Sequence, residues 1–317
     1  MLVLHADPWM PDYGMGFDVG ADELEGPPPD WRVETEDWSK GIAGGPPPSG
    51  SLWFIDGVRR IELRVLADDA DRRAPGLFGT YAAGAVSCDG QARFADHIVR
   101  RALVVGGGIA AVRVSVRSLV FDAESIAEVE PDAPLLHLQT LMRAAEADLA
   151  KAIADTDGRL VLADGPLAYT FYERATPSHV VGVVKRFVHV YLDPAQGALL
   201  GRLVPGQRTP LFSIGDERSR RFAWYVRLTR VRPPLHDHAG LVRCEVRYAI
   251  GVEAARRLAD QVTSALPVYV GHAWDPRTPQ NLAPIAGLES WLRHRMGDTR
   301  VVRRTLLEWL TRRDVAV

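Results

Sequence analysis

Hydrophobic and polar residues alternate in several short segments of the chain, and a period of two is typical of half-buried β-strands. The clearest segments are an apolar run at 51–57, a strict alternation at 60–67 and a further apolar segment at 76–90. The first and third end in Asp-Gly, a frequent turn dipeptide, so we predict three consecutive antiparallel strands here. Similar patterns predict strands at 112–121, 157–169, 179–192, 220–231 and 240–251.

Other segments repeat their apolar residues at intervals of three and four, which indicates amphipathic helices. The longest predicted helix covers 134–155 and directly precedes the predicted strand at 157–169. A helix in that position favours parallel pairing of the following strand with the antiparallel meander. The fold class is therefore α+β or mixed α/β. Shorter helices are predicted at 253–266, 282–296 and 301–313.

The first 50 residues contain the Pro/Gly clusters EGPPPDW and GIAGGPPPSG, which interrupt helices and central strands. We predict an irregular leader over 1–50 and a folded part over 51–317. With 317 residues, 47% of them hydrophobic and 25% charged, the chain is an ordinary globular one. The two cysteines form no metal-binding motif, and no apolar stretch reaches the roughly 18 residues of a membrane span, so we expect a cytoplasmic protein with no membrane association.

Two apolar segments that end in Asp-Gly provide the most informative candidate chemistry. Asp56 follows Trp53–Ile55, and Asp164 follows Val161–Ala163. If the two strands lie side by side, the carboxylates are neighbours, and paired carboxylates hold divalent ions in phosphoryl-transfer enzymes. Each Asp-Gly taken alone is more typical of an ordinary hairpin turn, and only the recurrence of the motif favours a metal site.

A third carboxylate could come from the helix at 134–155. Glu146 lies among three alanines, which allow a close approach to a sheet, but Asp148 is an alternative that periodicity cannot exclude. Lys185 interrupts the apolar run VVGVV, in a chain that has only three lysines. A buried lysine needs a compensating negative charge, whereas a lysine at a strand edge could extend to solvent.

The arginine-rich segment 218–232 also contains aromatic residues. This composition is typical of nucleic-acid grooves, although its alternation equally fits an ordinary half-exposed strand. Because the net charge is only −2, a polyanion would have to bind a local basic patch. The candidate nucleic-acid-binding residues are Trp224, Tyr225, Arg227 and Arg230.

The motifs FIDGVRR, VLADGPL and VVGVVKR occur in this order, with an acidic helix before the second. In this respect the chain resembles the NurA nuclease family over residues 50–295. The resemblance implies an RNase H-like core with a mixed sheet of five to six strands flanked by helices. It also implies Mn²⁺ or Mg²⁺ as cofactor, 5′-to-3′ exonuclease and single-strand endonuclease activity, a homodimer, and a HerA-type hexameric helicase as partner in DNA end resection.

Carried over to this sequence, the family pattern assigns metal binding to Asp56, Glu146 and Asp164, and a catalytic role to Lys185. The pattern departs near the C-terminal end, where the expected histidine is absent from TPQNLAPIAGLESWLRH. Glu289 or His272 could supply the fourth ligand instead. We therefore predict a metal-dependent DNA nuclease. The alternatives are a catalytically silent nucleic-acid-binding or partner-binding module and, more remotely, a phosphotransfer enzyme that acts on small molecules.

Overall fold

The computed structural model describes residues 2–6, 27–156, 159–167, 179–185, 190–217, 219–230, 235–271 and 280–314. In this part of the chain thirteen strands form one mixed sheet. The mixed α/β class is thus confirmed, but the sheet is larger than the predicted five to six strands. The strands are β1 (Val3–Ala6), β2 (Ile42–Ala43), β3 (Leu52–Asp69), β4 (Arg72–Asp89), β5 (Gln91–Val105), β6 (Val114–Val116), β7 (Leu119–Ser125), β8 (Val161–Asp164), β9 (Val180–Val184), β10 (Gln207–Arg208), β11 (Phe212–Ile214), β12 (Arg221–Arg227) and β13 (Leu241–Arg247).

Five strands in the order β5-β4-β3-β8-β9 form the centre of the sheet. Strands β3, β4 and β5 are an antiparallel meander, while β8 pairs in parallel with β3 and β9 in parallel with β8. This arrangement corresponds to the predicted RNase H-like core and confirms the parallel addition after the long helix. Antiparallel β13 and β12 extend the sheet beyond β9.

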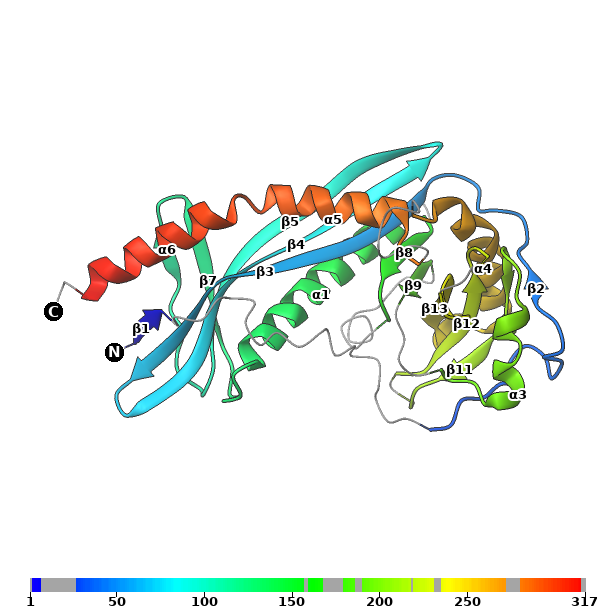
Figure 1. Cartoon of the computed structure of the whole chain (residues 1–317), viewed down its shortest axis with the longest axis horizontal. Helices are drawn as coiled ribbons and strands as arrows, with labels where there is room; N and C mark the ends of the chain where they lie inside the picture. Colours follow the sequence, from blue (N-terminus) through cyan, green and yellow to red (C-terminus); the bar gives the residue numbers. More distant parts are fainter. Residues whose placement is uncertain are drawn as a thin grey trace.

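Helices cover both faces of the long central strands (Figure 1). On one face, α1 (Ala133–Ala154) contributes Leu138 and Met142 to a cluster with Ile61 of β3. On the other, Leu288 and Leu292 of α5 (Ala283–Arg295) pack with Phe54 and other buried residues. No helix in the described ranges has both the length and the apolarity to cross a bilayer. The helices are α1 (Ala133–Ala154), α3 (Pro194–Gly197), α4 (Val252–Ala265), α5 (Ala283–Arg295) and α6 (Thr299–Asp314), with short 3-10 turns at Leu200–Arg202, Tyr248–Ile250 and Leu266–Tyr269.

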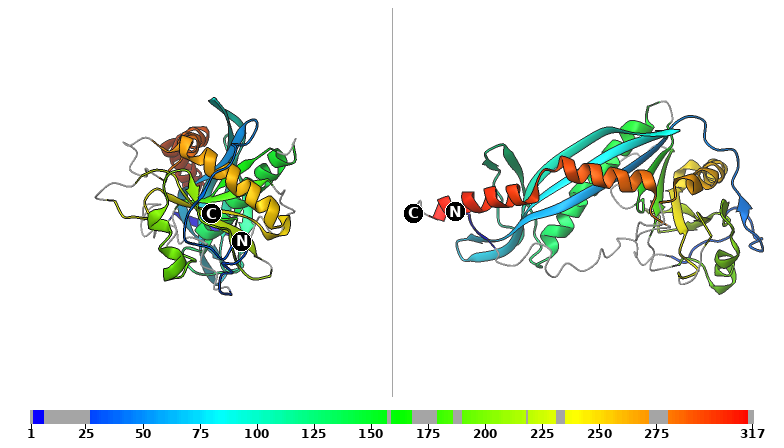
Figure 2. Two further views of the ribbon diagram at one scale, coloured as in Figure 1. Left: turned by 90° about the vertical axis from the view of Figure 1, so that its right-hand side faces the viewer. Right: turned by 45° about the horizontal axis from the view of Figure 1, so that its top comes forward.

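A β-bulge in β3 explains how α5 and α6 can follow the same face of the sheet. The register with β4 shifts between Ile61 and Leu63. Before the shift Val58 contacts the α5 cluster, and after it Leu63 packs with Leu306 of α6. Since side chains alternate between faces, the inserted residue reverses the parity and keeps the apolar positions under the helices. The two helices therefore run one after the other along an elongated molecule (Figure 2).

The predicted turn at Asp56–Gly57 is wrong. A single strand, β3, runs through both residues, and Gly57 pairs with Ala83 in the ladder. The local turn preference of Asp-Gly is outweighed because β4 pairs with β3 along its whole length.

The third strand of the meander is β5, which the sequence pattern did not identify. The predicted strand 112–121 is two short strands, β6 and β7, that meet at Arg117 with a φ of 51°.

The leader also differs from the prediction, because part of it joins the sheet. Strand β1 pairs with β3, and β2 pairs with β10. Between them, Glu34 forms a two-bonded ion pair with the fully buried guanidinium of Arg208, at 2.8 Å for each bond. Arg208 also contacts Asp260 of α4 at 2.8 Å. Backbone pairing and this ion-pair network anchor the segment 27–50, which local Pro/Gly content could not indicate.

Candidate metal centre

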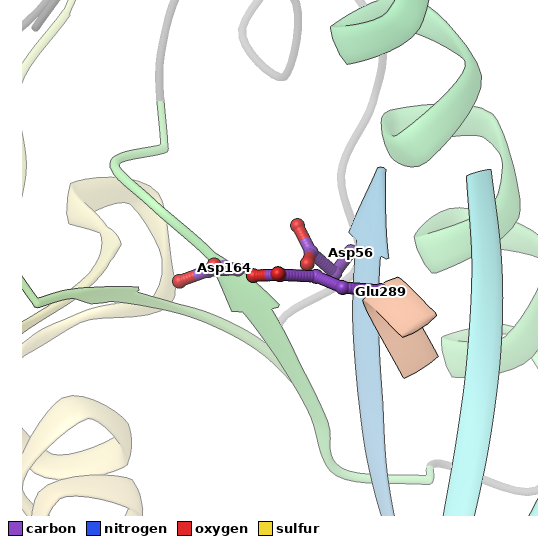
Figure 3. Close-up of side chains that lie close together, drawn as sticks. All are labelled: Asp56, Asp164 and Glu289. Atoms are coloured by element: carbon purple, nitrogen blue, oxygen red, sulfur yellow. The ribbon is translucent and has the colours of Figure 1, made fainter. Parts of the chain in front are cut away.

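Three carboxylates meet where β8 ends beside β3. Strand β8 pairs with Trp53–Ile55 of β3 and ends at Asp164, so this side chain lies next to Asp56. Helix α5 packs over β3 and β4 and brings in Glu289. One oxygen from each carboxylate lies within 4.8 Å of the other two (Figure 3). A cation at this position could be bound by all three groups.

Asp56 is the most buried of these three carboxylates, with a relative exposure of 6%. Its Oδ1 accepts a hydrogen bond from the backbone N–H of Gly57 at 2.8 Å, while its buried Oδ2 has no hydrogen-bond partner in the described part of the chain. Burial, and then the charge of Asp164, raise the pKa of Asp56 well above its ordinary value, although Lys185 opposes the shift. In the folded protein, the positive charge near this carboxylate is therefore too small to offset its burial and the neighbouring negative charge.

Lys185 stands directly after β9 and faces the same carboxylates. Its Nζ lies 2.6 Å from Oδ2 of Asp164 and donates a hydrogen bond to Oδ1 of Asn281 at 3.1 Å. Burial alone would lower the pKa of Lys185, but the charges of Asp164, Asp56 and Glu289 outweigh it and raise that pKa. The lysine is therefore positively charged. The alternative of a solvent-extended lysine is wrong, because the side chain has a relative exposure of 17%.

Glu146 approaches from α1, on the opposite face of β3. It is buried, whereas Asp148 is exposed, which confirms that Glu146 occupies the packed face of the helix. Its Oε2 accepts a hydrogen bond from Arg143 at 2.9 Å, and the same guanidinium donates to the backbone oxygen of Asp164 at 2.7 Å. Its Oε1 has no hydrogen-bond partner among the described residues. Burial raises the pKa of Glu146 although Arg143 acts against the shift.

Gly57 makes the close approach of Glu146 possible. A Cβ at this position would collide with Oε1 of Glu146 and lie 2.8 Å from Cγ of Met142. The glycine of the Asp-Gly motif thus creates space above the strand rather than a turn.

We expect Gly57→Ala to lower the free energy of unfolding by about 1–3 kcal/mol, because the added methyl overpacks the interface with α1. Urea denaturation at neutral pH measures this change. The matched control is Gly201→Ala, where a Cβ would meet open space and stability should hardly change. Equal stability of the two variants would contradict the packing that we describe at Gly57.

A cavity of about 300 Å³ opens at the three clustered carboxylates. Besides Asp56, Asp164 and Glu289, it is lined by Arg59, Gln139, Arg143 and Arg293 among others. The cavity is thus an acidic centre within a basic rim, an arrangement suited to a metal ion and an anionic substrate.

The chain matches no protein-family model, and no curated protein is similar to it in sequence. A solved structure, however, is similar over most of its length: the NurA nuclease from Sulfolobus solfataricus, with a TM-score of 0.51. The alignment covers 86% of this chain and 88% of that chain at 10% sequence identity. The fold is similar to that of NurA. The resemblance noted in the sequence motifs therefore extends to the three-dimensional fold.

Within this NurA-like fold, the predicted nucleic-acid groove at β12 is wrong. Trp224 and Tyr225 are fully buried because both faces of β12 are covered: Trp224 packs with Leu258 of α4, and Tyr225 packs with Phe212 of β11. The guanidinium of Arg227 is also buried, and it donates to the backbone oxygens of Ala239, Leu200 and Asp237. Alternation of residue types cannot distinguish a half-exposed strand from one covered on both faces.

The other predicted site residues have different placements. Arg230 is exposed, but it follows the end of β12 and does not share a strand face with Trp224. His272 lies outside the described residues. Sequence reasoning did not identify Arg143, although its position three residues before Glu146 places both on one helix face. It also missed Asn281, for which the sequence holds no comparable signal.

Proposed function

We propose that this chain is a divalent-metal-dependent deoxyribonuclease that hydrolyses phosphodiester bonds in DNA. The observation that carries the proposal is the buried Oδ2 of Asp56, which has no hydrogen-bond partner among the described residues and belongs to the three-carboxylate cluster. A buried carboxylate oxygen without a donor is costly, and coordination of a cation removes that cost. The similarity in fold to a nuclease supports the same conclusion.

The charges around the centre fit a divalent ion. The four carboxylates of Asp56, Glu146, Asp164 and Glu289 are accompanied by the cations of Arg143 and Lys185. When all of these groups are ionised, the formal charge is two units negative, which one divalent cation would neutralise. Carboxylate oxygens are ligands suited to Mg²⁺ and Mn²⁺. The donor set therefore fits the proposed cofactor.

Each residue of the centre has a proposed role. Asp56, Asp164 and Glu289 hold the ion, and Arg143 fixes Glu146 at the rear of the centre. When bound, such an ion polarises a phosphoryl oxygen and lowers the pKa of a coordinated water. Lys185 orients Asp164 and supplies a fixed positive charge where negative charge develops on the phosphate.

Degradation of a linear, end-labelled DNA tests this function. We expect cleavage with Mn²⁺ and none with EDTA, and no comparable turnover of mononucleotides. DNA binding without cleavage at any tested divalent ion would instead indicate the catalytically silent module. A preference for mononucleotides would indicate a phosphotransfer enzyme that acts on small molecules.

Finer features of this function are also proposals, supported by the motif resemblance and the similar fold. They are 5′-to-3′ exonuclease and single-strand endonuclease activity, DNA end resection in the cytoplasm, a homodimer and a HerA-type helicase partner. Substrates labelled at one end or closed into a single-stranded circle distinguish the activities. Light scattering and co-purification with the helicase test the assembly.

The two glutamates are expected to differ in their effect on metal binding. Glu289→Gln removes a direct ligand and should weaken Mn²⁺ binding by roughly 100-fold. Glu146 does not belong to the three-carboxylate cluster and supports it from outside, so Glu146→Gln should weaken Mn²⁺ binding by roughly tenfold. Isothermal titration calorimetry measures both affinities, with exposed Asp148→Asn as the control. If Glu146→Gln caused the greater loss, Glu146 would be the direct ligand instead.

A further inference from the structure

The edge of β3 beside the metal centre is unpaired over several residues. Strand β4 occupies one edge of β3 along its whole length. On the other edge, β8 pairs only as far as Ile55 and β1 begins only at Val65. No described strand pairs with the intervening stretch 56–64 on that side. The gap leaves an opening that begins at Asp56 and extends away from β8.

Two cavities adjoin along this opening, and Arg293 lines both of them. The first is the 300 Å³ cavity that contains the carboxylates. The second, of about 550 Å³, is lined by Arg60, Arg293, His294, the connection 296–298 between α5 and α6, and Thr299 at the start of α6. A groove therefore leads from the metal centre to the α5–α6 junction.

The groove becomes basic as it leaves the metal centre. Arg60 is held in place by Oε1 of Glu62 at 2.7 Å and by the backbone oxygen of Gly297 at 2.9 Å. Arg293 is exposed and has no ion-pair partner among the described residues. Oδ1 of Asp298, the acid of the second cavity, accepts hydrogen bonds from the backbone N–H groups of Arg300 and Val301 at 2.8 and 3.0 Å. One oriented and one unpaired guanidinium thus face an open groove.

We propose that Arg293 and Arg60 form a phosphate-binding subsite for the nucleic-acid strand, next to the bond that is cleaved. This assignment rests on the proposed function, because it places the scissile phosphate at the three carboxylates. Two guanidinium groups at successive points of one groove match the repeating phosphates of a polymer better than a single small anion. The subsite binds the backbone and carries no base specificity.

Binding without cleavage provides the first test. In EDTA, with a labelled single-stranded oligonucleotide, Arg293→Ala should weaken binding about five- to tenfold. For this variant, the slope of log affinity against log salt concentration should be shallower by about 0.7, which is the value for one phosphate contact with a single strand. The matched control is Arg295→Ala on the same helix, because Arg295 stacks over Trp291 and lines neither cavity. Arg293→Lys should restore most of the affinity.

Kinetics with Mn²⁺ provide the second test. Arg293→Ala should raise KM for DNA with little change in kcat, and this increase in KM should be larger for DNA than for bis-p-nitrophenyl phosphate, which has no neighbouring phosphate. Unchanged affinity and salt dependence in Arg293→Ala, or equal losses in Arg295→Ala, would overturn the proposal. If the parent protein cleaved no substrate, the proposed function would fail, while the binding measurement in EDTA would still decide the subsite.

Discussion

Asp56→Asn is expected to abolish Mn²⁺-dependent DNA cleavage while it stabilises the metal-free protein. The variant loses a direct ligand, so its rate should fall by more than about 100-fold, the upper end of the roughly 10–100-fold range for residues that support a ligand from outside. Stability should rise because burial and the charge of Asp164 disfavour the ionised carboxylate in the folded state. A raised pKa in the folded state means that the parent loses stability as the pH rises above 3.8, the ordinary value for this group. The stability advantage of the variant should therefore grow with pH over that range.

End-point cleavage assays and thermal denaturation in EDTA, each between pH 4 and 8, measure these two effects. Asp96→Asn is the control, because Asp96 is an exposed acid on β5 and its removal should change neither property. Added Mn²⁺ should raise the melting temperature of the parent and leave that of Asp56→Asn unchanged. Cleavage by Asp56→Asn near the parent rate would rule out a ligand role for this residue.

Arg208→Met is expected to lower the free energy of unfolding by roughly 3–5 kcal/mol, because it leaves the largely buried carboxylate of Glu34 without its principal cation. Glu34 then retains the backbone N–H of Leu211 at 2.8 Å and the more distant Arg256 at 3.8 Å. Urea denaturation quantifies the loss. The same variant should expose the segment 27–50 to protease, since Arg208 connects this segment to β10 and α4.

Arg32→Ala is the matched control for this network. Arg32 pairs with Glu36 at 3.9 Å, but both side chains are about 80% exposed, so its loss should change stability by less than about 0.5 kcal/mol. A second variant, Glu34→Gln, keeps the shape and removes the charge, and it should be destabilising like Arg208→Met. If Arg208→Met were as stable as Arg32→Ala, the segment 27–50 would contribute little to the fold.

The candidate centre could be predicted in part, because its two aspartates stand in similar local contexts. An apolar strand followed by Asp-Gly occurs at Asp56 and at Asp164, and the helix before the second strand indicates that the two strands are parallel neighbours. The reason inferred for the first motif was nevertheless wrong, since Asp56 lies within a strand. The proximity of Glu289 depends on how α5 crosses the sheet, so the sequence provided it only as an alternative to His272.

The sequence by itself determined the helices α1, α4, α5 and α6 and the fold class. The spacing of apolar residues, at intervals of two in strands and 3.6 in helices, is a local property of the chain and does not depend on how the elements pack. Only the tertiary structure decided which strands are covered on both faces, and therefore that Trp224 belongs to the core. The tertiary structure also decided that residues 27–50 of the leader are anchored to the sheet, because the partners of Glu34 lie more than 170 positions away along the chain. Burial and long-range ion pairs depend on contacts between distant segments, and no local pattern of residues encodes them.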